Sequence, residues 1–369
     1  MKARRLGAIM LKELRQLRRD RVTLAMIVLI PVMQLLLFGY AINFNLRGLH
    51  AGIADQANTA GSRALVMDML ATGVVKPVLV AQTPRQLTDA LRRGRINVGI
   101  VIPPDFEQRR SDGRTVAQIL VDGSDSSVLG AASQLAQVPV DGAAPDMRAP
   151  LRSTPAGGRI SVVGFYNPQR RTAINIVPGL IGIILTMTMV MFTAVAIVRE
   201  RERGNMELLI ATPLTSGELM IGKVLPYAGI GLIQTTLVLL LGVWLFHVPI
   251  RGSVLEVYVA AVLLILANLA LGLLISTRAQ SQFQSMQMTL FVFLPSILLS
   301  GFVFPFAGMP AFAQWLAELL PLTHFLRLIR GVMLRGADLS EMWIEVAALI
   351  AFIVVALTVA IVRFRKRLD

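Results

Sequence analysis

The chain has 369 residues, of which 55% are hydrophobic, and its mean hydropathy is +0.66. Soluble domains are about 45 to 50% apolar, so this composition excludes an ordinary soluble protein and indicates a membrane protein. The net charge of +14 does not by itself indicate nucleic-acid binding, because Lys and Arg usually flank membrane spans on the cytoplasmic side. The absence of cysteine excludes disulfides, thiolate metal sites and a cysteine nucleophile.

The chain opens with a basic segment that precedes an apolar run. Residues 1–21 predict an amphipathic helix at the membrane interface, because basic residues mostly surround an apolar stripe made of Leu6, Ile9, Met10, Leu14 and Leu17. The apolar residues 22–42 reach about 31 Å as a helix, the thickness of a bilayer core. Since no small-x-small cleavage site follows, we expect a retained first transmembrane helix and not a signal peptide.

Five further apolar runs have a similar length, and none of the six contains an internal Lys, Arg, Asp or Glu. They cover residues 174–198, 224–246, 257–275, 286–304 and 346–362. The fold class that we expect is therefore an α-helical polytopic membrane protein with six transmembrane helices.

The orientation follows from basic residues in the short flanking segments. Eight lie before the first span, four in residues 199–223, one at Arg278 and four in the tail 363–369. Basic residues in short segments favour the cytoplasm, so we expect these four segments to lie there.

The long segment 43–173 also carries 15 basic residues, but long domains cross a membrane largely regardless of charge. Short apolar runs such as "VGIVIP" alternate in it with polar helical stretches such as "TPRQLTDALRRG". This pattern predicts a mixed α/β domain, inserted between the first two spans on the extracytoplasmic side. A Pro/Gly-rich stretch at 138–158 interrupts the pattern and predicts a loop.

Residues 305–343 are too apolar for a free loop, yet prolines punctuate them at Pro305, Pro310 and Pro321. Because proline breaks a continuous span, we expect two short helices that re-enter the membrane or lie on its outer face.

Several motifs resemble chemical sites and fail on detail. "GELMIGKV" at 217–224 nearly matches the phosphate-binding loop, but Val224 replaces the hydroxyl that binds Mg²⁺ and no strand precedes Gly217. Asp122 to Ser126, "DGSDS", lacks the central glycine and distal glutamate of a calcium loop, so we expect a strand-to-helix turn. The three histidines are scattered, and no G-x-S-x-G is present. The residues indicate no enzyme.

The segment 199–223 combines several features in an order that an ordinary loop would not need. They are a charged turn, the apolar helix "MELLIA", a break at Pro213 and a second short helix. It resembles the coupling helix of the permease subunits of type-two ABC exporters, with the pattern E-x-G-[TN]-x-E-x-L-x-x-T-P followed by G-K. Asn205 stands where that family usually has threonine, and asparagine caps a helix equally well. The resemblance extends over nearly the whole chain, through "FYNPQRRTAINIVPGLIG", "LSGFVFP" and "PLTHFLRLIRGVMLRG".

This resemblance implies that the chain is the permease of an ABC transporter that exports an amphipathic or hydrophobic small molecule, drug-like or lipid-like. The residues implied in coupling to the ATPase subunit are Glu200, Glu202, Gly204, Asn205, Glu207, Leu208, Leu209 and Pro213. ATP and Mg²⁺ are expected on that partner and no cofactor on this chain. A second permease subunit, identical or paralogous, the lipid bilayer and a periplasmic adaptor are the other implied partners, with no nucleic acid. The implied location is the bacterial inner membrane.

Polar residues within the spans have two readings. Gln234, Asn268 and Gln287 are candidates for lining a substrate path. Hydrogen bonds between helices are their commoner role, and such bonds contribute about 0.6 kcal/mol on average in membranes.

Two other functions compete with the permease hypothesis. A proton-coupled secondary transporter would need titratable groups near the midplane, whereas Glu256 and Glu345 lie at span edges. A membrane-anchored sensor or assembly factor would not need six spans with a structured cytoplasmic segment.

Overall fold

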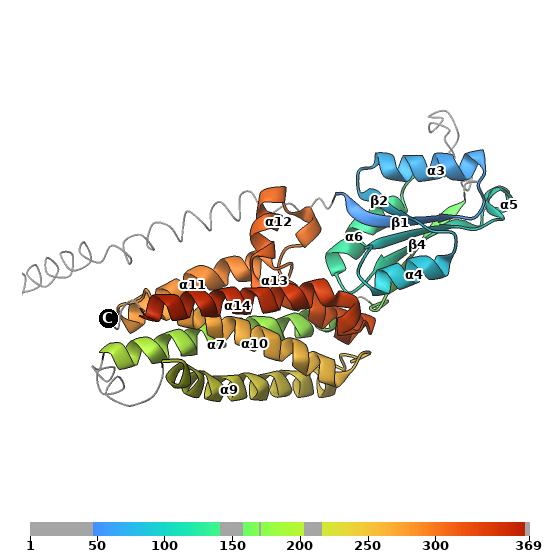
Figure 1. Ribbon diagram of the computed structural model, residues 1–369. Coiled ribbons are helices and arrows are strands. Elements are labelled where there is room, and N and C mark those ends of the chain that lie inside the picture. The colour runs from blue at the N-terminus through green and yellow to red at the C-terminus, as the bar shows by residue number, and fades with distance from the viewer. Residues whose placement is uncertain (1–46, 141–157, 170, 203–215, 366–369) are drawn as a thin grey trace, which may run out of the picture.

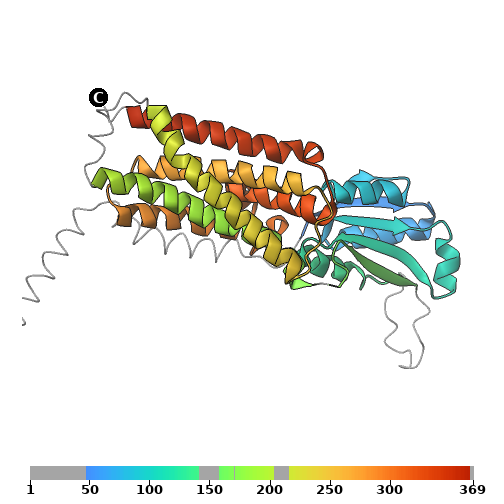
Figure 2. The ribbon, with the colours of Figure 1, turned by 90° about the horizontal axis from the view of Figure 1, so that it is seen from below.

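The computed structural model describes residues 47–140, 158–169, 171–202 and 216–365. The expected amphipathic helix 1–21, the first span 22–42, most of the loop 138–158 and the end of the tail lie outside the described residues. The described part consists of a helical bundle with an α/β domain at one end (Figure 1, Figure 2).

The α/β domain contains a five-stranded sheet with the strand order β2-β1-β3-β4-β5. Neighbouring strands are parallel except for the antiparallel pair β3 and β4. The strands are β1 (Leu49–Asp55), β2 (Val75–Val80), β3 (Val98–Ile102), β4 (Thr115–Asp122) and β5 (Arg159–Phe165). All five residues of the central strand β3 are buried, as the continuous apolar run "VGIVI" predicts.

Four helices cover the two faces of the sheet: α3 (Ala60–Ala71), α4 (Pro84–Arg92), α5 (Phe106–Ser111) and α6 (Ser126–Leu135). Apolar residues of α3, α5 and α6 share one core with the sheet, while Leu87 and Leu91 of α4 belong to a separate core on the other face. Local sequence starts these helices: Thr59 forms a capping box with Ser62, and Pro84 occupies the first turn of α4 behind the cap Thr83.

Among the described residues, five helices are long and apolar enough to cross a membrane. These candidate spans are Ala173–Glu202 on α7 (Thr172–Glu202), Pro226–Trp244 on α9 (Ser216–Trp244), Val254–Ser276 on α10, Gln282–Leu299 on α11 and Leu339–Arg363 on α14 (Trp343–Arg365). Each expected span from residue 174 onward overlaps one of them. The helix α7 continues four residues past the expected end at 198, so the first charged residues after the apolar run, 199–202, are helical.

The spans on α7 and α10 are more than half buried and form the centre of the bundle, whereas those on α9, α11 and α14 are mostly not buried and lie on its outside. Small residues let α7 and α10 approach closely, as at helix contacts in membranes. A Cβ on Gly272 would lie 2.8 Å from both the Val190 carbonyl oxygen and the Thr193 Cβ.

The segment 305–343 contains two short helices, α12 (Ala311–Glu318) and α13 (Pro321–Arg330). Pro310 and Pro321 stand at their starts, where a missing N–H costs nothing. They are flanked by the 3₁₀ turn η2 (Phe306–Gly308), the π-helical turn η3 (Gly331–Arg335) and the 3₁₀ turn η4 (Leu339–Met342). Nearly all of α13 is buried against α7, α10 and α14, so this helix is part of the bundle core.

Gly272→Leu should destabilise the protein by about 1 to 3 kcal/mol, because the new side chain has no room between α7 and α10. Gly229→Leu is the matched control, since nothing in the part of the chain that the structure describes lies within 4 Å of a Cβ at that helical glycine. Thermal unfolding of the purified variants in detergent measures the difference. Equal melting temperatures for the two variants would contradict the close packing of α7 on α10.

Candidate functional site

The coupling residues that the structure describes lie on the last turn of α7. Glu202 accepts hydrogen bonds from the Gln282 backbone N–H at 2.9 Å and from Gln282 Nε2 at 2.5 Å. The carboxylate therefore sits at the N-terminus of α11, where unpaired N–H groups favour negative charge. Arg201 donates to the carbonyls of Ser276 and Ala279, both at 3.1 Å. The end of α7 is thus fixed to the connection between α10 and α11.

Glu200 also lies on this turn. The other expected coupling residues fall outside the described part of the chain, and their role stays a prediction. They are Gly204, Asn205, Glu207, Leu208, Leu209 and Pro213.

The candidate substrate-path residues do not share one surface. Gln234 Oε1 lies 2.9 Å from the Thr188 hydroxyl, and the buried Asn268 donates to Thr186 at 3.2 Å. Residues 186 and 188 are about 200° apart around α7, so Gln234 and Asn268 contact different sides of that helix. Both side chains therefore form hydrogen bonds between helices, which is the commoner of the two roles considered for them.

Two buried amide oxygens, Asn268 Oδ1 and Gln287 Oε1, have no hydrogen-bond partner within the described residues. A buried acceptor without a hydrogen-bond partner destabilises the fold, so each of these two oxygens could accept a hydrogen bond from a bound molecule. A role in a substrate path remains a prediction for all three residues.

At the opposite end of the bundle, ion pairs join it to the sheet. Asp122, at the end of β4, lies 3.3 Å from Arg335 of η3, and both side chains are at least nine-tenths buried. Asp125 lies 4.0 Å from Arg330. Glu341 lies 2.7 Å from Arg92 and is also close to Arg93. The "DGSDS" stretch forms the expected turn between β4 and α6, but sequence reasoning missed that its carboxylates contact the bundle.

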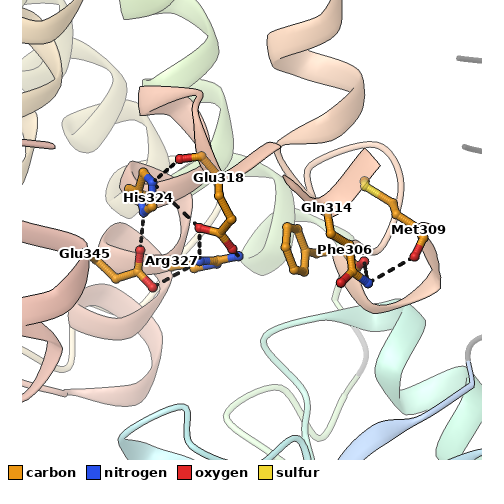
Figure 3. Close-up of polar contacts among 7 residues, drawn as sticks. All are labelled: Phe306, Met309, Gln314, Glu318, His324, Arg327 and Glu345. Carbon is orange, nitrogen blue, oxygen red and sulfur yellow. Dashed lines mark hydrogen bonds and ion pairs between the residues drawn. The ribbon is translucent and has the colours of Figure 1, made fainter. Parts of the chain in front are cut away.

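A second polar cluster joins α12, α13 and α14 and was also missed (Figure 3). His324 Nδ1 lies 2.5 Å from Glu345 Oε2, and its Nε2 lies 2.8 Å from the Glu318 carbonyl oxygen. Arg327 binds both carboxylates, at 2.6 Å to Glu318 and 3.2 Å to Glu345, and stacks over Phe306 at 4.5 Å. Gln314 fixes the turn beside it by donating to the carbonyls of Phe306 and Met309.

The environment of His324 favours its charged form. Burial lowers the pKa of the imidazole, but the hydrogen bonds to the Glu345 carboxylate and the Glu318 carbonyl and the Glu345 charge together raise it above its ordinary value. An imidazolium donates from both ring nitrogens, which matches a carboxylate on one side and a carbonyl on the other. The cluster lies where the bundle faces the sheet, since Glu318, Arg327 and Glu345 line the cleft between them.

His324→Gln should destabilise the protein by about 1 to 3 kcal/mol at pH 6 and by less at pH 9. A pKa raised above the unfolded value of about 6.5 gives stability that is complete below that pH and is lost as the pH rises through the folded pKa. Melting curves in detergent at the two pH values measure this, with the exposed His50→Gln as control. A destabilisation that does not change with pH would argue against a charged imidazole.

The chain matches known proteins over nearly its full length. The model of the ABC-2 family transporter protein matches residues 21–362. The probable multidrug ABC transporter permease YbhS of Escherichia coli (strain K12) is 30% identical over 376 residues, covering 99% of this chain and 98% of that protein. The probable multidrug ABC transporter permease YbhR of the same organism is 28% identical, with 98% and 99% covered. The inner membrane transport permease YhhJ, also from that organism, is 29% identical with 96% of each chain covered.

These matches confirm the resemblance that the coupling segment indicates. They span the bundle, the sheet and the segment between α7 and α9 together, so they are not due to one shared motif. The chain therefore belongs to the ABC-2 family of transporter permeases.

Proposed function

We propose that this chain is the membrane-spanning subunit of an ATP-driven exporter, and that it moves an amphipathic or hydrophobic small molecule out of the cytoplasm or the inner leaflet. The family match over residues 21–362 is the observation that carries the proposal. Relatives named as probable multidrug permeases support the substrate class. Mg²⁺ and ATP would bind a separate ATPase subunit.

The geometry at the end of α7 suggests how the force of ATP hydrolysis enters the bundle. Movement of the segment 199–223 would displace the end of α7. The hydrogen bonds of Arg201 and Glu202 would transmit this displacement to α10 and α11. In a helix-in-groove contact, apolar anchors usually dominate affinity, while charges at the rim tune orientation and rate. Leu208 and Leu209 would be the anchors on the ATPase subunit.

The proposed orientation places the α/β domain outside the bacterial inner membrane and the segment 199–223 in the cytoplasm. The basic residues of the short segments support it. Six spans, with the first at 22–42, would complete one permease. A second permease subunit would cover part of the apolar surface on α9, α11 or α14, and lipid would cover the rest.

Leu208→Asp or Leu209→Asp should lower export and ATPase stimulation by tenfold or more, because a charge would enter the apolar groove unpaired. Glu202→Ala should have a smaller effect, of severalfold, because it loosens α11 without removing an anchor. The measurement uses inside-out vesicles that contain the permease with its ATPase subunit. Gln137→Asp is the control, since it adds the same charge at an exposed position of the α/β domain, away from the end of α7.

Each variant must first be shown to insert at the wild-type level. Wild-type export and ATPase stimulation in both leucine variants would mean that the segment is only a solvated loop.

A further inference from the structure

A cleft of about 720 Å³ separates the α/β domain from the end of the bundle. The N-terminal ends of β1, β2 and β3, the end of β4 and the loop after α4 form one wall. The turn after α11, together with α13 and the start of α14, forms the other wall. Figure 1 shows the sheet at the end of the bundle that carries α12.

Three tryptophans place a membrane–water interface at the level of this cleft. They are the only tryptophans in the chain, and all are highly exposed: Trp244 by 79%, Trp315 by 81% and Trp343 by 65%. Trp343 lines the cleft, and Trp315 lies on α12 between two residues that line it. Trp244 is the last residue of α9. Two residues later, the Phe246 carbonyl accepts a hydrogen bond from Arg171, which follows β5, so this end of α9 also lies beside the α/β domain. Tryptophan prefers this depth because its ring is apolar and its N–H is polar.

The carboxylates that line the cleft are already neutralised. Asp122, Asp125, Glu318, Glu341 and Glu345 each lie within 4.0 Å of an arginine. The arginines in these pairs come from α4, α13 and η3. A ligand in the cleft would therefore meet little free negative charge from the described part of the chain.

Three cations on the sheet side of the cleft have no carboxylate within 4.0 Å in the part of the chain that the structure describes: Arg47, Lys76 and Arg95. All three side chains are exposed. Lys76 pairs in register with His50 of β1, and the Asn97 N–H donates to the His50 carbonyl at 2.8 Å. The fold thus brings β2, the start of β1 and the loop of Arg95 to one edge.

An apolar surface lines the same cleft as these cations. Trp343 and Ile344, the first two residues of α14, line it and are each about two-thirds exposed. Guanidinium and ammonium groups bind phosphate, while an exposed Trp and Ile at the interface suit an acyl chain. Cationic and apolar walls at one membrane depth match an anionic amphiphile.

We propose that this cleft binds an anionic phospholipid, with Arg47, Lys76 and Arg95 holding the phosphate of the headgroup and Trp343 and Ile344 contacting the acyl chains. The site does not depend on transport or on an ATPase subunit, so it can be tested on the purified permease alone.

The test uses the fluorescence of Trp343 in the full-length Trp244→Phe/Trp315→Phe protein, reconstituted in phosphatidylcholine nanodiscs. Phosphatidylglycerol or phosphatidylcholine with brominated acyl chains is titrated over the same range of mole fractions, because bromine quenches a tryptophan in contact with the chain. Brominated phosphatidylglycerol should quench Trp343 at a concentration at least tenfold lower than brominated phosphatidylcholine.

Arg47→Gln/Lys76→Gln/Arg95→Gln in this background should abolish the preference, because each lost cation weakens association by about fivefold. Arg63→Gln/Arg85→Gln/Arg114→Gln should retain it, since it removes three charges from exposed residues of the same domain that do not line the cleft. Equal quenching by the two lipids, or equal effects of the two triple variants, would overturn the proposal.

A final arm separates a lipid from a soluble phosphate. Inorganic phosphate in the millimolar range should leave the preference intact when compared with chloride at equal ionic strength. Loss of the preference in phosphate alone would show a site for soluble phosphate and overturn the assignment to lipid. Melting curves of both triple variants should match that of the parent protein, because all six side chains are exposed.

Discussion

The structure depends on the burial of one short helix, α13, in the bundle core. Its apolar residues Leu322 and Phe325 are fully buried, and Gly182 of α7 makes room for them, since a Cβ there would lie 2.7 Å from each side chain. Its polar residues cannot remain unpaired at such depth. His324 and Arg327 therefore bind Glu318 and Glu345, while Arg330 and the following Arg335 reach Asp125 and Asp122 of the α/β domain. The helix α13 and the turn η3 that follows it thus join α7, α12, α14 and the α/β domain.

This arrangement mechanically couples the two ends of the proposed exporter. Removing one partner of a buried pair such as Asp122 and Arg335 costs about 3 to 5 kcal/mol, so the sheet cannot leave the bundle freely. Movement of α7 relative to α14 would displace α13 and η3 and, through Arg330 and Arg335, the α/β domain. The bonds of Arg201 and Glu202 fix the other end of α7 to α10 and α11. A displacement at the segment 199–223 would then reach the cleft at the opposite end.

The sequence predicts the features that depend on local patterns. Apolar length locates the helices from residue 174 onward, and short apolar runs predict strands such as β3. Proline is less informative: Pro310 and Pro321 start helices, but Pro178, Pro226 and Pro295 lie inside long ones, where neighbouring helices can compensate for the lost bond.

The paired charges could not be predicted, because His324 and Glu345 are 21 residues apart and Asp122 and Arg335 are 213 apart. A single sequence carries no signal for such pairs, and the roles of residues 204–213 and of Gln234, Asn268 and Gln287 remain predictions.

The most direct test of the link between the bundle and the α/β domain is a distance distribution between spin labels on the α/β domain and the far end of the bundle. The absence of native cysteine allows labels at Ser111→Cys and Gln280→Cys, both exposed. Double electron–electron resonance should give one narrow distribution, which should broaden when Asp122→Asn and Glu341→Gln remove the charges that bind Arg335, Arg92 and Arg93. The exposed pair Asp112→Asn/Glu107→Gln should leave it narrow. A broad distribution without these substitutions, or one that the first pair does not change, would contradict the account.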